Sequence, residues 1–257
     1  IFLLKFEFSG IISQLNNSKN FLKNKLRIKM KKNSDVVLLI PAFNEQSRIA
    51  KVVKSCRKFF SFILVVDDGS KDKTFQEAVD AKANKVIRHC INCGQGTALK
   101  TGINYFLSLK NKKYLITFDA DGQHLVEDAL RMLDYSQLKG ADAVLGSRFL
   151  KKNKNLGINF GRKLVLQLAR IFEKVFFNIN LTDSHNGLRV LSKKSCKKLF
   201  NIKSSSMAHA TEISSILTKS NLKIYEYPCK ILYGVNNKKS QSIINSINII
   251  SDLLQNK

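Results

Sequence analysis

Short apolar runs alternate with segments of helical spacing from Val36 onward. Runs of β-branched and other apolar residues, such as 36–40 and 62–66, are typical of strands buried on both faces. The segments between such runs carry apolar residues three and four positions apart, which predicts amphipathic helices. We expect strands at residues 36–40, 62–66, 85–88, 114–118 and 143–146, and helices at about residues 49–60, 73–83, 96–109 and 126–133.

Strands that alternate with helices of this length form βαβ units, because parallel neighbours need a crossover connection. The pattern therefore predicts an α/β fold: a mostly parallel sheet with helices on both faces. The second half is less regular, with extended structure expected at 223–233 and basic amphipathic helices at 158–178 and 241–255. Each helix either packs on the core or lies on a membrane surface with its lysines toward anionic headgroups.

The pattern divides the chain into three parts. Residues 1–33 lack clean periodicity, and we expect them to be an N-terminal extension that is non-native or disordered, with Met30 as the true start and residues 1–29 non-native or poorly packed. The regular α/β domain is expected at 34–235, followed by a C-terminal amphipathic helix at 236–257. No apolar run approaches the roughly 18 residues that a membrane-spanning helix needs.

Composition adds a strong positive charge. The 257 residues hold 44 Lys and Arg against 19 Asp and Glu, a net charge of +25. The excess favours an anionic partner, namely nucleic acid, an anionic membrane surface or a phosphate-rich substrate, unless the lysines merely solvate the surface. A hydrophobic fraction of 44% argues against wholesale disorder. Five cysteines, an odd number, favour a reducing cytoplasm over a secreted disulfide scaffold.

Three polar clusters follow the ends of expected strands: PAFNE at 41–45, DDGS at 67–70 and DADGQH at 119–124. Open α/β sheets bind ligands at this edge. Asp119 and Asp121 lie two positions apart and can both reach one divalent cation, to which Gln123 can add a neutral oxygen. The clusters therefore predict a Mg²⁺ or Mn²⁺ site at the carboxyl edge of the sheet.

His89, Cys90 and Cys93 form an H-C-x-x-C cluster. No second CxxC or His pair completes a zinc site, so we interpret the cysteines as free thiols in a binding loop. The adjoining NCGQG segment lacks the G-K-[ST] sequence of a phosphate-binding P-loop, which argues against nucleoside triphosphate hydrolysis.

Six segments occur in a characteristic order: VVLLIPAFNE, ILVVDDGSKDKT, NCGQGTALKTG, FDADGQH, GSRF and DSHNGLR. Together they resemble the family-2 glycosyltransferases, in particular the dolichyl- and polyprenyl-phosphate mannosyl- and glucosyltransferases, over roughly residues 36–235. The resemblance implies a GT-A-like (Rossmann-like) fold, a nucleoside-diphosphate-sugar donor, a divalent metal (Mg²⁺ or Mn²⁺) and inversion at the anomeric carbon.

The resemblance also implies roles for individual residues. The implied nucleotide-sugar-binding residues are Pro41, Ala42, Phe43, Glu45, Asp67, Asp68, Gly69, Asn92, Gly94, Gly96, Asp119, Ala120, Arg148, Arg189 and Lys239. The implied metal ligands are Asp119, Asp121 and Gln123, and the implied catalytic residues are Asp121, Arg148, Asp183 and Glu212. The chain departs from the family pattern at Gln95, where Lys is usual, and at Asn186, where Ser or Thr is usual. An Arg expected near Tyr233 is absent, and Lys239 is expected to supply its charge.

The acceptor decides whether a base is needed. A lipid monophosphate, with a second pKa of about 6, is already ionised near neutral pH, whereas a sugar hydroxyl needs a base, for which Asp183 and Glu212 are candidates. Glu212 is equally well explained as a structural residue.

We expect sugar transfer to an isoprenoid phosphate by a cytoplasmic enzyme, peripheral on the inner face of the membrane, held there by anionic lipids or by a small membrane protein. The alternatives are transfer to a glycan hydroxyl in surface polysaccharide synthesis, a nucleotidyltransferase on a similar sheet, and a basic nucleic-acid-binding protein. A nucleic-acid-binding role is disfavoured, because no reading element accompanies the charge.

Overall fold

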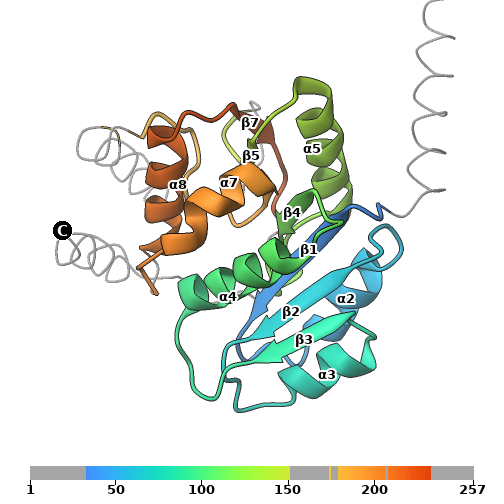
Figure 1. Cartoon of the computed structure of the whole chain (residues 1–257). Helices are drawn as coiled ribbons and strands as arrows, with labels where there is room; N and C mark the ends of the chain where they lie inside the picture. Colours follow the sequence, from blue (N-terminus) through green and yellow to red (C-terminus); the bar gives the residue numbers. More distant parts are fainter. Residues whose placement is uncertain (1–32, 151–173, 175–178, 206–207, 233–257) are drawn as a thin grey trace, which may run out of the picture.

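The computed structural model describes residues 33–150, 174, 179–205 and 208–232 and contains one seven-stranded sheet (Figure 1). The strand order is β3-β2-β1-β4-β6-β5-β7. All neighbouring strands pair in parallel except β6, which is antiparallel to both β4 and β5. The strands are β1 (Val36–Ala42), β2 (Ile63–Asp67), β3 (Lys85–Arg88), β4 (Tyr114–Thr117), β5 (Ala143–Ser147), β6 (Arg189–Ser192) and β7 (Ile224–Pro228). The expected mostly parallel α/β sheet is confirmed.

Helices cover both faces of this sheet, as expected (Figure 1). One face packs against α2 (Ile49–Cys56), α3 (Thr74–Asp80) and α5 (Val126–Lys139). The other face packs against α4 (Gln95–Ser108), α7 (Lys193–Lys198), the 3-10 helix η1 (Leu199–Asn201) and α8 (His209–Lys219).

Strand β1 lies inside the sheet, between β2 and β4, and its environment accounts for its apolar sequence. All seven of its residues are buried. Leu38 and Ile40 pack toward α2, α3 and α5, whereas Val37 and Leu39 pack toward α4 and α8. Because successive side chains of a strand point to opposite faces, a strand covered on both faces must be apolar throughout. Gly102 lets α4 approach closely, since a β-carbon there would overlap the side chain of Leu39.

Four described elements of the second half were not predicted: β6, α7, η1 and α8. Strand β6 reads R-V-L-S, which is too short to show a period, and its extended state comes from pairing with β4 and β5 on either side. The expected helix at 158–178 lies outside the described residues except for residue 174, which is helical, and the expected helix at 241–255 and residues 1–32 of the expected extension lie outside them entirely. Among the described residues, no helix has both the length and the apolar character needed to cross a bilayer.

Candidate active site

The turns that follow β1 and β2 are joined by hydrogen bonds at the carboxyl edge of the sheet. The backbone N–H of Asn44 donates to Ser70 Oγ at 2.9 Å, and that of Glu45 donates to Thr74 Oγ1 at 2.7 Å. The N–H of Asp68 donates to the carbonyl of Ala42 at 2.8 Å. The PAFNE and DDGS clusters therefore form one rim.

The turn after β4 reaches the same rim. Burial raises the pKa of the Asp121 carboxyl above its ordinary value, and the negative charges of Asp119 and Glu45 raise it further. Glu45 belongs to the β1 turn and also pairs with Arg48 at 2.8 Å, and the charge of Asp121 in turn raises the pKa of Arg48, though less than Glu45 does. Asp121 thus lies within electrostatic reach of the β1 turn, and the three predicted clusters converge.

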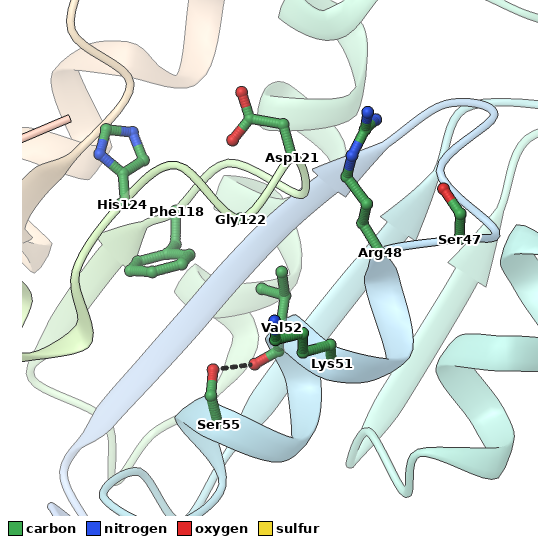
Figure 2. Close-up of a pocket in the computed structure, with 9 residues that line it drawn as sticks. All are labelled: Ser47, Arg48, Lys51, Val52, Ser55, Phe118, Asp121, Gly122 and His124. Carbon is green, nitrogen blue, oxygen red and sulfur yellow. Dashed lines mark hydrogen bonds between the residues drawn. The ribbon is translucent and has the colours of Figure 1, made fainter. Parts of the chain in front are cut away.

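A pocket of about 340 Å³ opens between α2 and the turn after β4 (Figure 2). Arg48 and Lys51 contribute positive charge from the α2 side, and Asp121 borders the pocket from the opposite turn. The complete lining is Ser47, Arg48, Lys51, Val52, Ser55, Phe118, Asp121, Gly122 and His124. Arg48 and Lys51 were not among the predicted site residues, because no motif marks them.

His124 and Arg189 keep Asp119 ionised. Asp119 Oδ2 lies 2.8 Å from His124 Nε2. Burial by itself would raise the pKa of Asp119, but the hydrogen bond and charge of His124, followed by the charges of Arg189 and His209, hold that pKa below its usual value. Arg189 is only 2% exposed. An ionised carboxylate is the form that binds a cation.

Asp119 and Asp121 fit a divalent metal ion. His124 occupies one oxygen of Asp119, and the Gln123 backbone N–H donates to one oxygen of Asp121 at 2.9 Å, so each carboxylate keeps a second oxygen for a cation. Their mutual repulsion, visible in the raised pKa of Asp121, is what a bound cation would relieve. Hard oxygen ligands of this kind suit Mg²⁺ or Mn²⁺ with further ligands from a phosphate group. The role of the Gln123 side chain stays a prediction.

Asp68 anchors the loop at residues 89–96. Its Oδ1 accepts the backbone N–H of Cys93 at 3.0 Å, and its Oδ2 accepts that of Gly94 at 2.7 Å. His89 Nδ1 lies 2.7 Å from the same Oδ1, and Asn92 Nδ2 donates to the Asp68 carbonyl at 3.3 Å. Asp68 therefore ties loop 89–96, with the predicted contacts Asn92 and Gly94, to the end of β2.

Loop 89–96 is covered by a segment from the second half of the chain. A β-carbon on Gly94 or Gly96 would overlap the carbonyl of Ser205 or Ser204, respectively. The carboxylate of Glu212 accepts the backbone N–H groups of Lys203 at 2.9 Å and Ser204 at 2.7 Å. Glu212 thus holds the segment that packs on the loop.

Arg148 and Asp183 form a two-point ion pair. Arg148 Nε and Nη2 each lie 2.7 Å from one Asp183 oxygen, and the Arg148 backbone N–H donates to Oδ2 at 3.0 Å. Glu226 Oε1 in turn accepts from the backbone N–H groups of Thr182 at 2.7 Å and Asp183 at 3.3 Å. Glu226 was not predicted, because a single acidic residue within an extended segment carries no motif.

The remaining predicted residues are distributed as follows. Pro41, Ala42 and Ala120 are buried at the strand ends, and Phe43 is exposed. Asp67 is fully buried and accepts the Ser70 N–H at 3.1 Å. Gly69 has a φ of +70°, and a β-carbon there would overlap the backbone of Ile91. Lys239 lies outside the described residues.

Comparison with known proteins places this chain in a family. The model of the family "Glycosyl transferase family 2" matches residues 37–200. A UDP-N-acetylglucosamine–dolichyl-phosphate N-acetylglucosaminyltransferase of Methanococcus voltae is 30% identical over 227 residues, 77% of this chain and 86% of that protein. An undecaprenyl-phosphate mannosyltransferase of Micrococcus luteus is 29% identical over 160 residues, 60% of this chain and 65% of that protein.

A solved structure supports the same fold. Glucosyl-3-phosphoglycerate synthase of Mycobacterium tuberculosis, in complex with Mn²⁺, UDP and glucosyl-3-phosphoglycerate, superposes with a TM-score of 0.64 at 16% identity, over 87% of this chain and 80% of that one. The sheet with its helices is therefore the GT-A-like fold that the motifs led us to expect. With the family model spanning more than half of its length, the chain belongs to glycosyl transferase family 2.

Proposed function

We propose that this glycosyltransferase moves a sugar from a nucleoside diphosphate to an isoprenoid phosphate, with inversion at the anomeric carbon and with Mg²⁺ or Mn²⁺. The observation that carries the proposal is the convergence of the turns bearing Glu45, Asp68 and Asp121 on one rim of the sheet. Open α/β sheets bind nucleotides in the crevice outside the carboxyl ends of their strands, where such turns meet.

The charges of the site suit the departure of a nucleoside diphosphate. The bond between the anomeric carbon and the diphosphate oxygen breaks with its electron pair going to the diphosphate, while an acceptor oxygen bonds to the opposite face of that carbon. A divalent cation held by Asp119 and Asp121 would neutralise negative charge on the diphosphate. Arg148, oriented by Asp183, supplies further positive charge for the leaving group.

A phosphate acceptor agrees with the contacts of the two candidate bases. Both oxygens of Asp183 accept hydrogen bonds from Arg148, and both oxygens of Glu212 accept backbone N–H groups. Carboxylates engaged in this way are poorly placed to remove a proton from a sugar hydroxyl. A lipid monophosphate needs no base, since its second pKa is about 6. These contacts favour the lipid phosphate over the glycan hydroxyl.

The acceptor brings the enzyme to a membrane. The relative from Methanococcus voltae is named for transfer to dolichyl phosphate. The net charge of +25 favours the anionic inner face of a membrane. We propose a cytoplasmic, peripheral enzyme that lipid headgroups or a small membrane protein hold beside its acceptor.

The test is transfer by the purified full chain from a panel of nucleotide sugars to polyprenyl phosphate, with and without Mn²⁺. We expect a lipid-phosphate sugar that forms only with metal and only when Asp121 is intact, as checked with Asp121→Ala. Transfer to a glycan but not to the lipid would favour the first alternative. Salt-sensitive DNA binding that persists in Asp119→Ala/Asp121→Ala, without donor binding by the unmodified chain, would support the nucleic-acid alternative.

A further inference from the structure

Three side chains with different metal-binding atoms meet at the end of β2. Asp68, His89 and Cys93 each offer one ligand atom, and these atoms lie within 4.8 Å of one another. Asp68 is 25 positions away from Cys93, so the sequence pattern H-C-x-x-C gave no sign of it. We propose that these three residues bind one Zn²⁺ ion, separate from the metal at Asp119 and Asp121, and that the ion competes with the nucleotide sugar.

The spacing suits a tetrahedral zinc site. Bond lengths of about 2.0–2.3 Å place the ligands of a tetrahedral Zn²⁺ about 3.3–3.8 Å apart. The ligand atoms that lie farthest apart need to approach by about 1.5 Å at most, whereas His89 Nδ1 and Asp68 Oδ1, which are 2.7 Å apart, need to separate by about 1 Å. Asp68 is buried, and the other two side chains are half-buried, which leaves a fourth position open to solvent or to a ligand. A thiolate, an imidazole and one carboxylate select Zn²⁺ over Mg²⁺, which prefers oxygen ligands only.

The contacts around His89 already orient it as a ligand. Its Nδ1 lies 2.7 Å from Asp68 Oδ1, and its Nε2 lies 2.9 Å from Thr101 Oγ1. A metal ion at Nδ1 would take the place of the proton shared with Asp68, while Nε2–H donates to Thr101. Ligand histidines are oriented in this way by a hydrogen bond from their second nitrogen. In the neutral imidazole the single ring proton then lies on Nε2, so binding releases only the thiol proton of Cys93 to solvent.

The other cysteines are poor ligands. Burial raises the pKa of Cys56 and Cys229 to about 12 and raises the pKa of Cys196 further, so these thiols stay protonated. Cys90 is exposed and lies outside the group of converging atoms. Cys90 therefore serves as a matched control for Cys93, since both belong to loop 89–96.

The position of the ion explains why we expect it to compete with the nucleotide sugar. Asp68 holds loop 89–96 through the N–H groups of Cys93 and Gly94. An ion on Asp68 and Cys93 would occupy the same turn that we expect to contact the nucleoside. This competition rests on the proposed function, whereas the binding of the ion does not.

Co²⁺ in place of Zn²⁺ tests the site, because a cobalt–thiolate bond gives a near-ultraviolet charge-transfer band. We expect the band to correspond to one thiolate-bound Co²⁺ per full-length chain, to disappear when Zn²⁺ displaces that ion, to be lost in Cys93→Ser and to be retained in Cys90→Ser. A band that survives in Cys93→Ser, or that disappears in Cys90→Ser, would overturn the site.

The competition has its own measurement. At a Zn²⁺ concentration about ten times its dissociation constant, the KM for the nucleotide sugar should rise about tenfold in the unmodified chain and in Cys90→Ser. In Cys93→Ser the ratio of the KM values with and without Zn²⁺ should stay near one. A chain that binds Co²⁺ through Cys93 but shows an unchanged KM would refute the competition and leave the site standing. A chain without any transferase activity would refute the proposed function alone.

Discussion

The α-carbon of Gly187 lies against the carboxylate of Asp119, so closely that a β-carbon at Gly187 would overlap both carboxylate oxygens. Thr117 fixes this approach by donating from Oγ1 to the Gly187 carbonyl at 2.6 Å. The loop before β6 therefore packs directly against the carboxylate of Asp119, a proposed metal ligand.

Gly187→Ala should therefore displace Asp119 and lower the transferase activity about 100-fold, the cost expected for a misplacement of about 1 Å. The measurement is kcat/KM at saturating Mn²⁺ together with the melting temperature. Gly140→Ala is the control, because a β-carbon at Gly140 meets nothing within 4 Å and that substitution should affect stability only. Equal activities of the two variants would contradict the prediction.

His124 should set the metal affinity through Asp119. Its hydrogen bond at 2.8 Å orients the carboxylate and keeps it ionised. His124→Ala should weaken Mn²⁺ binding about 10- to 100-fold, the usual effect of losing a partner of a metal ligand. His124→Gln, which keeps a hydrogen-bond donor, should recover part of that loss. Calorimetry with Mn²⁺ measures both, and unchanged affinity in His124→Ala would show that Asp119 does not need this partner.

Asp121→Asn should lower the transferase activity but raise the stability of the metal-free chain. Because the pKa of Asp121 is raised in the folded chain, that chain binds more protons than the unfolded one, and stability falls as the pH rises through the folded pKa. At neutral pH the substitution removes an unfavourable buried charge, so the metal-free variant should melt at a higher temperature than the unmodified chain. The transferase activity should fall about 100- to 1,000-fold.

The stability gain of Asp121→Asn should shrink as the pH falls toward the ordinary Asp pKa of about 3.9, where the native carboxyl is neutral too. Melting curves in the presence of a chelator at both pH values measure this. A gain that is independent of pH would show that the charge of Asp121 is not its cause.

We expect the contributions of Arg148 and Asp183 to the free energy of unfolding to be coupled. Asp183 is almost fully buried and accepts from Nε and Nη2 of Arg148, so the loss of either charged group breaks a buried ion pair, which typically costs about 3–5 kcal/mol of stability. A double-mutant cycle with Arg148→Met and Asp183→Asn should give a double variant no less stable than the single ones. Additive losses in the free energy of unfolding would show that the two side chains are not coupled.

Glu212→Gln should raise the KM for the donor while leaving kcat nearly unchanged. The amide keeps one acceptor oxygen, so one of the N–H groups of Lys203 and Ser204 loses its partner, at a cost of about 1–3 kcal/mol. The segment over loop 89–96 then loosens, and the KM should rise about tenfold. Glu127→Gln, on the exposed side of α5, is the control. A large drop in kcat with an unchanged KM would instead support a base role and a hydroxyl acceptor.

The local pattern of the chain was sufficient for the first half of the fold. Strands β1 to β5 and helices α2 to α5 were all predicted, because apolar runs and helical spacing are properties of consecutive residues. The bounds were less exact for two helices, since α2 ends at Cys56, four residues before the expected end, and α5 continues to Lys139, six residues beyond it. The polar clusters at strand ends also predicted that the turns bearing Asp68 and Asp121 lie at the same edge, since parallel strands bring their carboxyl ends to one edge regardless of the details of packing. The metal-binding role of Asp119 and Asp121 stays a prediction.

Tertiary structure alone decided the contacts between distant segments. Three of these contacts join residues far apart in the chain. Strand β6 pairs with both β4 and β5, Glu226 accepts the backbone N–H of Asp183, and Asp68 accepts the backbone N–H of Cys93. Hydrophobic periodicity records which face of an element is buried, but not which polar group lies opposite it. The partners of these polar groups depend on how the whole sheet and its covering helices pack. They could therefore be identified only from the three-dimensional structure.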